Sequence, residues 1–394
     1  MSTLEYLRGQ GAEVVFCPVD SFGRLDLGTL GRLVDAETLL VCAMLANNEI
    51  GTLQDVAAIA GISRRHGALC LSDCVQALGK VPVNVKALGV DYATFSAHKI
   101  HGPKGVGALY AREGSPLRPF VHGGHQEGGL RAGTESLHNI AGFGTACAGA
   151  DGLLARAAEV RQLRDRLAAG FRALRPDAVV RSPADACLPN TLSVTVPGVS
   201  NAAFMAMLDS NGIAVSAGSA CNTQADEPSH VLTAVGLTAD QARQTIRISL
   251  STGTTRRDVD YVIRVAGDYF QGRTAPIDMV LPAQLNENLL LDEHTFILDV
   301  RFWHDRKLLK GLPNSHEIPF LSFGKYLHLV PKDRKILVVC QTGYNSPVVA
   351  YALRKRHYRD VSFLLTGLAG WWIARKDLYD RLAGRNITRL ERGG

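Results

Sequence analysis

FSAHKIHGPKGVGALY, residues 95–110, joins the end of an apolar run to a basic, glycine-rich turn. Lys99 follows directly after Ser96, Ala97 and His98, and the glycines beyond it allow the backbone to pass close to a ligand. A lysine at the end of a strand can form a Schiff base with an aldehyde cofactor, although a solvated turn lysine has the same local sequence. Lys104, in GPKG, is the alternative candidate for that role.

Two polar residues precede this stretch in similar settings. Asp73 ends the apolar run ALCLSD, 26 residues before Lys99, and Asn48 lies in the strand-to-helix turn ANNEIGTLQD. We expect Asp73 to be a buried carboxylate, which is rare unless it has a partner. Pyridoxal phosphate enzymes use such a group to keep the pyridine nitrogen protonated. Asn48 could equally be an exposed capping residue.

The surrounding pattern predicts an α/β protein of several domains. Strand-like runs alternate with helical stretches such as 53–66, which favours a mostly parallel sheet over residues 1–150. A long amphipathic helix over 151–174 opens a smaller α/β domain that ends at 270, with a last helix over 256–270. Residues 271–283 read as a linker with some freedom to swing, and the strand–helix rhythm restarts over 284–394. The predicted strands are AEVVF (12–16), TLLVCAML (38–45), ALCLSD (68–73), YATFSAH (92–98), VGALYA (106–111), TLSVTV (191–196), IRISL (246–250), TFILDVR (295–301), KILVVC (335–340) and DVSFLL (360–365).

Composition excludes several classes of function. The net charge is +6, and residues 272–394 hold 19 Lys+Arg against 12 Asp+Glu, without the dense basic stripe that nucleic-acid binding needs. No uncharged apolar run approaches the roughly 18–20 residues of a membrane span, and the N-terminus does not resemble an export signal. The cysteines include no CxxC pair, so we expect no metal site. A cytoplasmic protein that contacts neither membrane nor nucleic acid is the expectation.

Two cysteines lie in surroundings that favour chemistry. Cys221 belongs to the small-residue loop VSAGSACNTQADEPSHVL, where a thiolate could attack the sulfur of a cofactor-bound cysteine, although an inert loop thiol is the alternative. Cys340 ends the apolar run KILVVC, and a helix is expected to start near Ser346. The loop amides and the helix dipole could together hold an anionic sulfur on Cys340.

The motifs NNEIGTLQD, SDCVQALGK, SAHKIHGPKG, RAGTE and SAGSAC together resemble the cysteine desulfurases, which are pyridoxal phosphate enzymes of the class V aminotransferase kind. The resemblance covers about residues 1–270. It implies a fold-type I pyridoxal phosphate transferase with a partial large domain (1–150) and a small domain (151–270), acting on L-cysteine as a homodimer. The implied roles are Lys99 as the Schiff-base lysine, Asp73 on the pyridinium, Gln76 on the ring hydroxyl, Ser96 and His98 on the phosphate, Thr134 on the phosphate of a neighbouring subunit, Asn48 on cofactor and substrate, Arg247 on the substrate carboxylate and Cys221 as sulfur acceptor.

The C-terminal region, about residues 284–385, resembles a rhodanese-like sulfurtransferase domain. Cys340 would carry the sulfur, and Asp299 with Arg301 would match the family's early Asp-Val-Arg. The loop departs from many rhodaneses by having Asn345 where they carry arginine, so a changed or lost activity stays open. A cysteine phosphatase is disfavoured, because the arginine it needs six residues after the cysteine is replaced by Ser346.

These resemblances predict a cysteine desulfurase that leaves a persulfide on Cys221 and passes sulfur to Cys340. An iron–sulfur scaffold or a thiolation carrier would be the final acceptor. The family's first segment, with its phosphate-binding turn at a helix N-terminus and its ring-stacking histidine, is expected to be absent from this chain. Two alternatives stay open: a selenocysteine lyase-like activity, and a cofactor-free truncated protein that serves as a binding or regulatory module.

Overall fold

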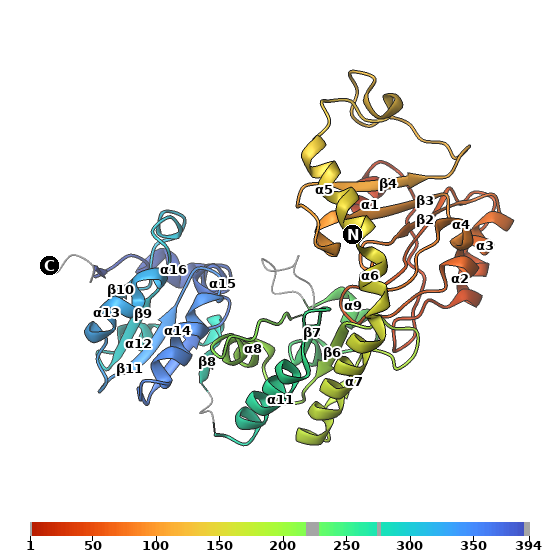
Figure 1. Cartoon of the computed structure of the whole chain (residues 1–394). Helices are drawn as coiled ribbons and strands as arrows, with labels where there is room; N and C mark the ends of the chain where they lie inside the picture. The colour runs from red at the N-terminus through yellow and green to blue at the C-terminus, as the bar shows by residue number, and fades with distance from the viewer. Residues whose placement is uncertain (1, 218–227, 274–276, 390–394) are drawn as a thin grey trace.

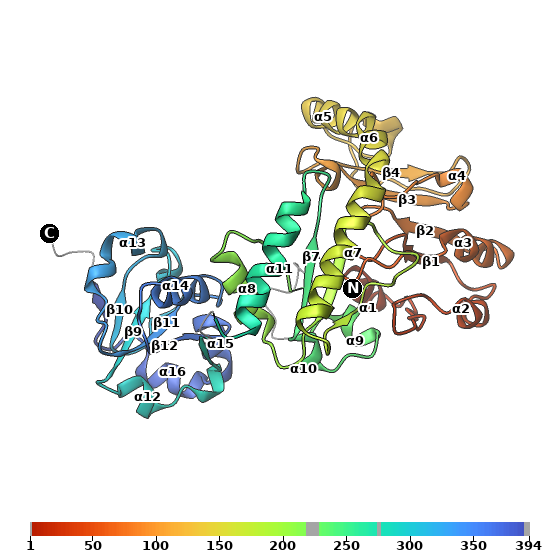
Figure 2. The ribbon, with the colours of Figure 1, turned by 60° about the horizontal axis from the view of Figure 1, so that its bottom comes forward.

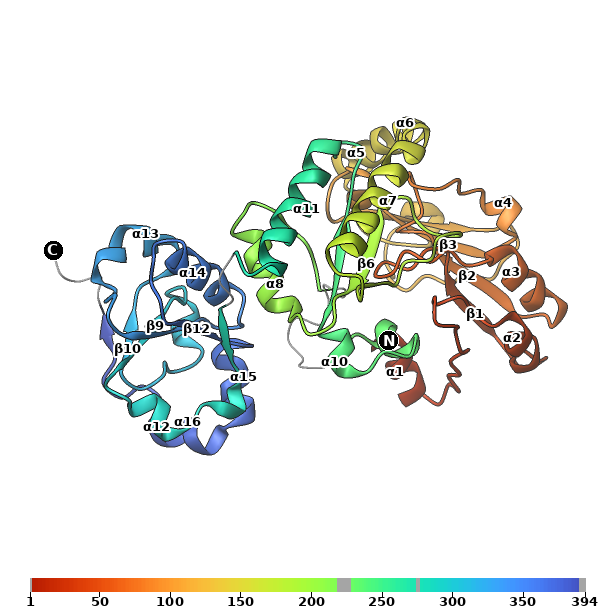
Figure 3. The ribbon, with the colours of Figure 1, turned by 90° about the horizontal axis from the view of Figure 1, so that it is seen from below.

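The computed structural model describes residues 2–217, 228–273 and 277–389, which form three sheets with their covering helices (Figure 1). Figures 2 and 3 show the three units side by side, with the small middle unit between the N-terminal and C-terminal ones. Among these residues, no helix combines the length and the apolar character that crossing a membrane requires.

The N-terminal sheet has the strand order β1-β2-β3-β4 and carries most of the predicted site residues on its edge. The first three strands are parallel and β4 is antiparallel, so the prediction of a mostly parallel sheet is confirmed. The predicted strand 12–16 is wrong: that segment forms no strand, and Val15 and Phe16 are exposed. The strands are β1 (Leu40–Met44), β2 (Leu69–Asp73), β3 (Tyr92–Ser96) and β4 (Gly107–Ala111).

Helix α3 (Val56–Arg65) shows how the local sequence fixes this unit. Asp55 caps the helix by accepting a hydrogen bond from the Ala58 amide at 3.0 Å. Ile59 and the other apolar residues on its buried face then pack on β1 and β2. Other elements of this unit are α1 (Ser2–Gly9), α2 (Leu27–Leu33), α4 (Val85–Leu88), η1 (Ala97–Ile100), η2 (Gln126–Gly129) and α5 (Leu137–Ala148).

The middle unit is an antiparallel sheet, β5-β6-β7, covered by two long helices. The helix predicted over 151–174 is interrupted at Arg156, whose backbone leaves the helical region. The helix predicted over 256–270 is confirmed, and Thr255 opens it with a capping box to Asp258. The elements are α6 (Ala150–Ala155), α7 (Ala157–Leu174), β5 (Val179–Val180), β6 (Thr191–Thr195), α8 (Asn201–Asp209), α9 (His230–Ala234), α10 (Ala239–Ala242), β7 (Thr245–Ser249) and α11 (Arg256–Phe270).

The C-terminal unit is a six-stranded parallel sheet with the order β13-β10-β9-β11-β12-β8. Its first strand, β8, pairs with β12 and lies inside the range predicted as a linker. The strands are β8 (Asp278–Val280), β9 (Thr295–Asp299), β10 (Ser315–Glu317), β11 (Lys335–Val339), β12 (Val361–Leu364) and β13 (Thr388–Arg389). The helices are η3 (Pro282–Gln284), α12 (Glu287–Leu291), η4 (Asp305–Lys307), η5 (Phe320–Ser322), α13 (Phe323–Tyr326), η6 (Leu327–Leu329), α14 (Asn345–Arg354), α15 (Gly367–Ala374) and α16 (Lys376–Leu382).

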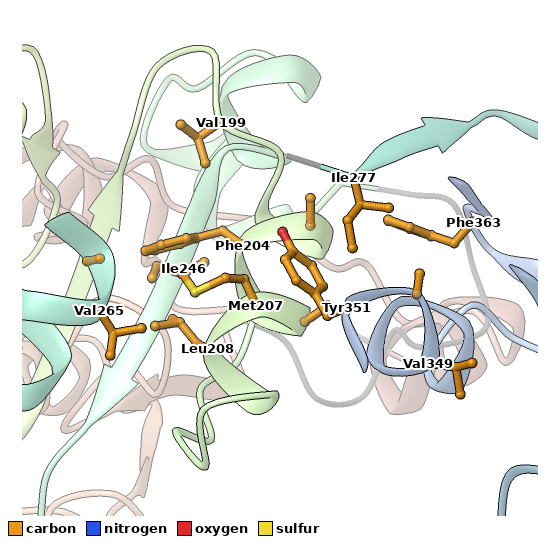
Figure 4. Close-up of a cluster of buried hydrophobic side chains, with 14 of the residues drawn as sticks. Val199, Phe204, Met207, Leu208, Ile246, Val265, Ile277, Val349, Tyr351 and Phe363 are labelled. Atoms are coloured by element: carbon orange, nitrogen blue, oxygen red, sulfur yellow. The ribbon is translucent and has the colours of Figure 1, made fainter. Parts of the chain in front are cut away.

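The middle and C-terminal units share one apolar core, formed where α8 packs on α14. Figure 4 shows Tyr351 of α14 lying beside Phe204 and Met207 of α8. Lys355 closes the rim of this contact, because its Nζ donates to the Ser210 carbonyl at 2.8 Å. We call this contact the shared core. It holds the C-terminal unit against the middle one.

Candidate active site

The carboxyl ends of β1, β2 and β3 lie level with one another, and this register assembles the predicted site. Asp73, the last residue of β2, is paired with Met44 of β1 and with Thr94 of β3. Asn48 follows β1, and Lys99 follows β3 in the short helix η1. Segments far apart in sequence therefore converge at one sheet edge, which is where open α/β sheets bind ligands.

Lys99 lies at this edge of the sheet together with the nearby Ser96 and His98. The side chain of Lys99 is exposed, as is His98. Ser96 Oγ and His98 Nδ1 are hydrogen-bonded at 2.7 Å. Ala97 and Ile100 are the buried residues of η1. Their packing fixes the position of this turn, whereas the side chain of Lys99 stays accessible. An accessible primary amine beside a hydroxyl and an imidazole can meet both a carbonyl group and a phosphate.

Asp73 differs from the expectation of a buried carboxylate. It is exposed, although its backbone is still paired with β1 and β3. Its Oδ1 accepts a hydrogen bond from the Val75 amide at 2.8 Å, which orients the carboxylate in the turn after the strand. The carboxylate thus lies in an open position at the sheet edge, available to a ligand.

Lys80 is a residue of the site that sequence reasoning missed. Its Nζ donates to the Gln76 carbonyl at 2.9 Å and lies 3.3 Å from Gln76 Oε1. Burial, together with the smaller effect of the charge on Lys99, lowers the pKa of Lys80 to about 8. Lys80 therefore holds Gln76 through hydrogen bonds, and its pKa depends on the charge of Lys99. The four-residue spacing of Gln76 and Lys80 was the only signal for this contact.

Arg247, on β7, brings the middle unit to the same edge. Its Nη1 donates to the Asn48 carbonyl at 2.7 Å, across 199 positions of sequence. Its Nε is buried and has no hydrogen-bond partner among the described residues. Burial lowers the pKa of Arg247, and the nearby Glu49 carboxylate opposes that shift. A buried guanidinium N–H with no partner is costly, so this one is suited to an anionic ligand.

Glu49 is a second residue that sequence reasoning missed. It is 2% exposed and accepts a hydrogen bond from Ser229 Oγ at 2.6 Å. Ser229 in turn caps α9, because its Oγ accepts from the Leu232 amide. Glu49 therefore links the turn after β1 to the start of α9, close to Arg247.

Two predicted residues are not part of this group. Thr134 is exposed on the segment between η2 and α5, and within the described part of the chain no hydrogen bond joins it to Lys99 or Asp73. Cys221 lies outside the residues that the structure describes.

Cys340 lies in a tight loop at the carboxyl end of β11. It is 2% exposed; its Sγ accepts a hydrogen bond from the Gly343 amide at 3.1 Å and lies 3.4 Å from Ser346 Oγ. Gly343 has a φ of +86°, and a Cβ there would meet the Thr366 nitrogen at 2.7 Å. The loop can close on the sulfur only because this position has no side chain.

The Asp299–Arg301 pair ties β9 to the same loop. Arg301 is 1% exposed, and its Nε and Nη2 donate to the Asp299 carboxylate at 2.8 to 3.0 Å. Its Nη1 donates to the Leu309 carbonyl at 2.7 Å and lies 3.5 Å from Gln341 Oε1. Each nitrogen of the Arg301 guanidinium therefore donates within the protein, which supports the Cys340 loop from β9.

The fold defines an α/β protein in which a class V aminotransferase region is followed by a rhodanese-like unit. Residues 2–262 match the Aminotransferase class-V family, to which the chain belongs, and residues 281–374 match the Rhodanese-like domain. The chain is similar to the cysteine desulfurase NifS of Azotobacter vinelandii, at 41% identity over 67% of this chain and 66% of the relative. It is also similar to a cysteine desulfurase of Klebsiella pneumoniae, at 38% identity over 71% of this chain and 73% of the relative.

Solved structures give the same result. A NifS-like protein superposes with a TM-score of 0.63 at 40% identity, covering 68% of this chain and 71% of the other. SspA in complex with cysteine superposes with a TM-score of 0.56 at 30% identity, covering 64% of this chain and 71% of the other. The chain thus spans about two thirds of the length of the relatives that it matches.

Pyridoxal 5'-phosphate is the cofactor of this family, and the groups at the sheet edge fit it. An accessible amine on Lys99 faces the same edge as the open carboxylate of Asp73. Ser96 and His98 offer a hydroxyl and an imidazole beside them. Arg247, which contacts the Asn48 carbonyl, has an unpartnered Nε that could donate to an anion.

Proposed function

We propose that this chain carries out the cysteine desulfurase reaction, in which L-cysteine yields L-alanine and a persulfide on Cys221. The observation that carries the proposal is the Arg247 guanidinium, held on the Asn48 carbonyl at 2.7 Å with a buried, unpartnered Nε. A planar guanidinium with a free N–H suits the carboxylate of an amino acid. The named desulfurase relatives support the choice of cysteine as substrate.

In this proposal the sheet edge holds the cofactor. Asp73 would contact the ring nitrogen, Gln76 would contact the ring hydroxyl and Lys80 would keep Gln76 in place. When bound, the cofactor supplies an electron sink that weakens bonds to the substrate Cα. Lys99 Nζ would move protons at that carbon, since it is the accessible amine at this edge. Ser96 and His98 would bind the phosphate.

The sulfur step is assigned to Cys221. Its thiolate would attack the substrate sulfur, so that a sulfur–sulfur bond forms and the carbon–sulfur bond breaks. The electron pair of the broken bond stays on carbon, which takes a proton and becomes the methyl group of alanine. Arg247 and Asn48 would hold the substrate carboxylate throughout, so that the sulfur stays in reach of the thiolate.

Transfer of the persulfide sulfur to Cys340 is the second part of the proposal. The Gly343 amide on Cys340 Sγ would stabilise a sulfur anion. Because Cys340 is 2% exposed, the loop would have to open to receive or release sulfur. An iron–sulfur scaffold or a thiolation carrier would take the sulfur onward. We also propose a homodimer, in which Thr134 would meet the partner's cofactor phosphate, and a location in the cytoplasm.

The decisive experiment is a product assay on the full chain loaded with pyridoxal 5'-phosphate. L-cysteine should be converted to equal amounts of alanine and total sulfide under a thiol reductant. Lys99→Ala should remove both products, whereas the control Lys104→Ala should retain them. Cofactor binding without alanine production, or full activity in Lys99→Ala, would contradict the assignment.

The relay needs its own test. After incubation with sulfur-labelled cysteine, peptide mapping should find persulfide on Cys221 and on Cys340 in the parent chain. Cys221→Ala should remove the label from both sites, and Cys340→Ser should leave it on Cys221. Cys187→Ser, at a buried thiol in the middle unit, is the matched control and should change neither. A Cys221 that loads normally beside an unlabelled Cys340 would refute the relay alone.

A further inference from the structure

A separate pocket of about 630 Å³ opens in the C-terminal unit beside the Asp299–Arg301 pair. Three cations line it: Arg301 after β9, Arg306 in η4 and Lys310 beyond it. The apolar part of the lining comes from the segment that follows α16. We call this the Arg306 pocket; its lining is Arg301, Arg306, Lys310, Gly311, Glu317, Ala383, Gly384 and Ile387.

Arg306 is only partly used by the protein. Its Nη1 donates to Glu317 Oε2 at 3.1 Å, and both side chains are largely buried. Its Nε and Nη2 are buried and have no hydrogen-bond partner among the described residues. These two N–H groups lie on the same side of the guanidinium and form a fork that matches two oxygens of one anion. Leaving such a fork empty in a buried position costs free energy, which a ligand would recover.

The charges around the pocket favour an anion. Arg301 is neutralised by Asp299, with which it forms a buried pair. Arg306 forms an ion pair with the Glu317 carboxylate. Lys310, which also lines the pocket, has no ion pair within the described part of the chain. The wall therefore keeps a net positive charge. Its volume lies in the range typical of sites for small organic molecules, and Ala383 and Ile387 offer a surface for carbon atoms.

We propose that the Arg306 pocket binds a small organic molecule through an oxyanion head group. Because Arg306 Nε and Nη2 have almost no accessible surface, the guanidinium would have to turn toward the pocket to receive the head group. Lys310 would then lie beside the head group, and the carbon body would lie against Ala383 and Ile387. This site is distinct from the Cys340 loop, whose residues do not line the pocket. The two are neighbours through Arg301, which lines the pocket and contacts Gln341. The inference does not depend on the desulfurase proposal, because it uses none of its residues.

The test is calorimetric titration of the full chain with three probes of similar size: butyl phosphate, pentanoate and the neutral butanol. We expect saturable binding of at least one anion and none of butanol. Tighter binding of butyl phosphate would identify a phosphate head group, and tighter binding of pentanoate would identify a carboxylate. Inorganic phosphate should bind more weakly than butyl phosphate, by about tenfold, because it lacks the alkyl chain that the apolar wall would cover.

Two variants assign the binding to this pocket. Arg306→Lys keeps a positive charge beside Glu317 but removes the fork, so affinity should fall roughly tenfold or more. Lys310→Met should weaken binding without touching the Glu317 pair, and it carries the test if Arg306→Lys shows a lowered unfolding midpoint. Lys307→Met, at an exposed lysine over the Trp303 ring, is the matched control and should bind like the parent. Failure of both anions to bind, or unchanged affinity in both variants, would overturn the proposal.

Discussion

Tyr351→Ala should weaken the middle and C-terminal units together, because this side chain belongs to their shared core. Tyr351 is 1% exposed, and it lies beside Phe204 and Met207 of α8 (Figure 4). Removing a buried aromatic ring costs about 3–5 kcal/mol, and loss of the buried hydroxyl offsets a part of this. Since a domain is stable by only about 5–15 kcal/mol, the change should be large in any unfolding experiment.

Two probes separate the units in that experiment. All three tryptophans lie after residue 300, so their fluorescence during urea unfolding reports the C-terminal unit alone. Hydrogen exchange of the α8 amides, followed by mass spectrometry, reports the middle unit. Tyr351→Ala should lower the urea midpoint and also speed exchange in α8. Leu378→Ala, at an equally buried position in the other core of the C-terminal unit, should lower the midpoint with little change in α8 while the unit stays folded. If α8 exchange is the same in both variants, the coupling through the shared core is refuted.

Three further predictions concern the sites. Arg247→Lys should raise the KM for cysteine at least tenfold, because a lysine lacks the guanidinium fork, and it should leave the cofactor absorbance unchanged. An unchanged KM in steady-state assays would argue against carboxylate binding by Arg247. Gly343→Ala should cost roughly 1–3 kcal/mol from its left-handed backbone, lowering the thermal unfolding midpoint, whereas Gly324→Ala, in open space, should not. Burial lowers the pKa of Lys80 to about 8 from 10.5, so the unfolded chain binds more protons between those values and the free energy of unfolding should rise with pH there. Lys80→Met should flatten that rise in urea titrations, and a parallel slope would contradict the reasoning.

Local sequence was enough to predict the sheet edge that carries Lys99 and Asp73. Each follows an apolar run that ends in polar residues, and parallel strands place such ends together. The exposure of Asp73 could not be predicted in the same way, because it depends on which segments cover the edge. Glu49 was missed because its partner, Ser229, comes from 180 positions away. Periodicity also cannot detect the interruption at Arg156, since apolar residues continue on both sides of it.

The same limit applies to the contact between units. The apolar face of α8 is readable from its sequence, but nothing local says that α14 covers it. Strand β8 was not predicted for a similar reason, because its pairing with β12 depends on a strand some eighty positions later. Short-range pattern therefore predicted most of the longer strands and helices and their order, whereas the packing of α8 on α14 required the tertiary structure.

The shared core has a consequence for the order of events during synthesis. Helix α8, at residues 201–209, leaves the ribosome well before α14, at residues 345–354, has been made. Until then, Phe204 can pack on Phe171 and Phe270 of the middle unit, but the part of α8 that α14 covers lacks its partner. Exposed apolar surface on a nascent chain invites aggregation and chaperone binding. The middle unit of this protein should therefore complete its folding only when translation is nearly finished.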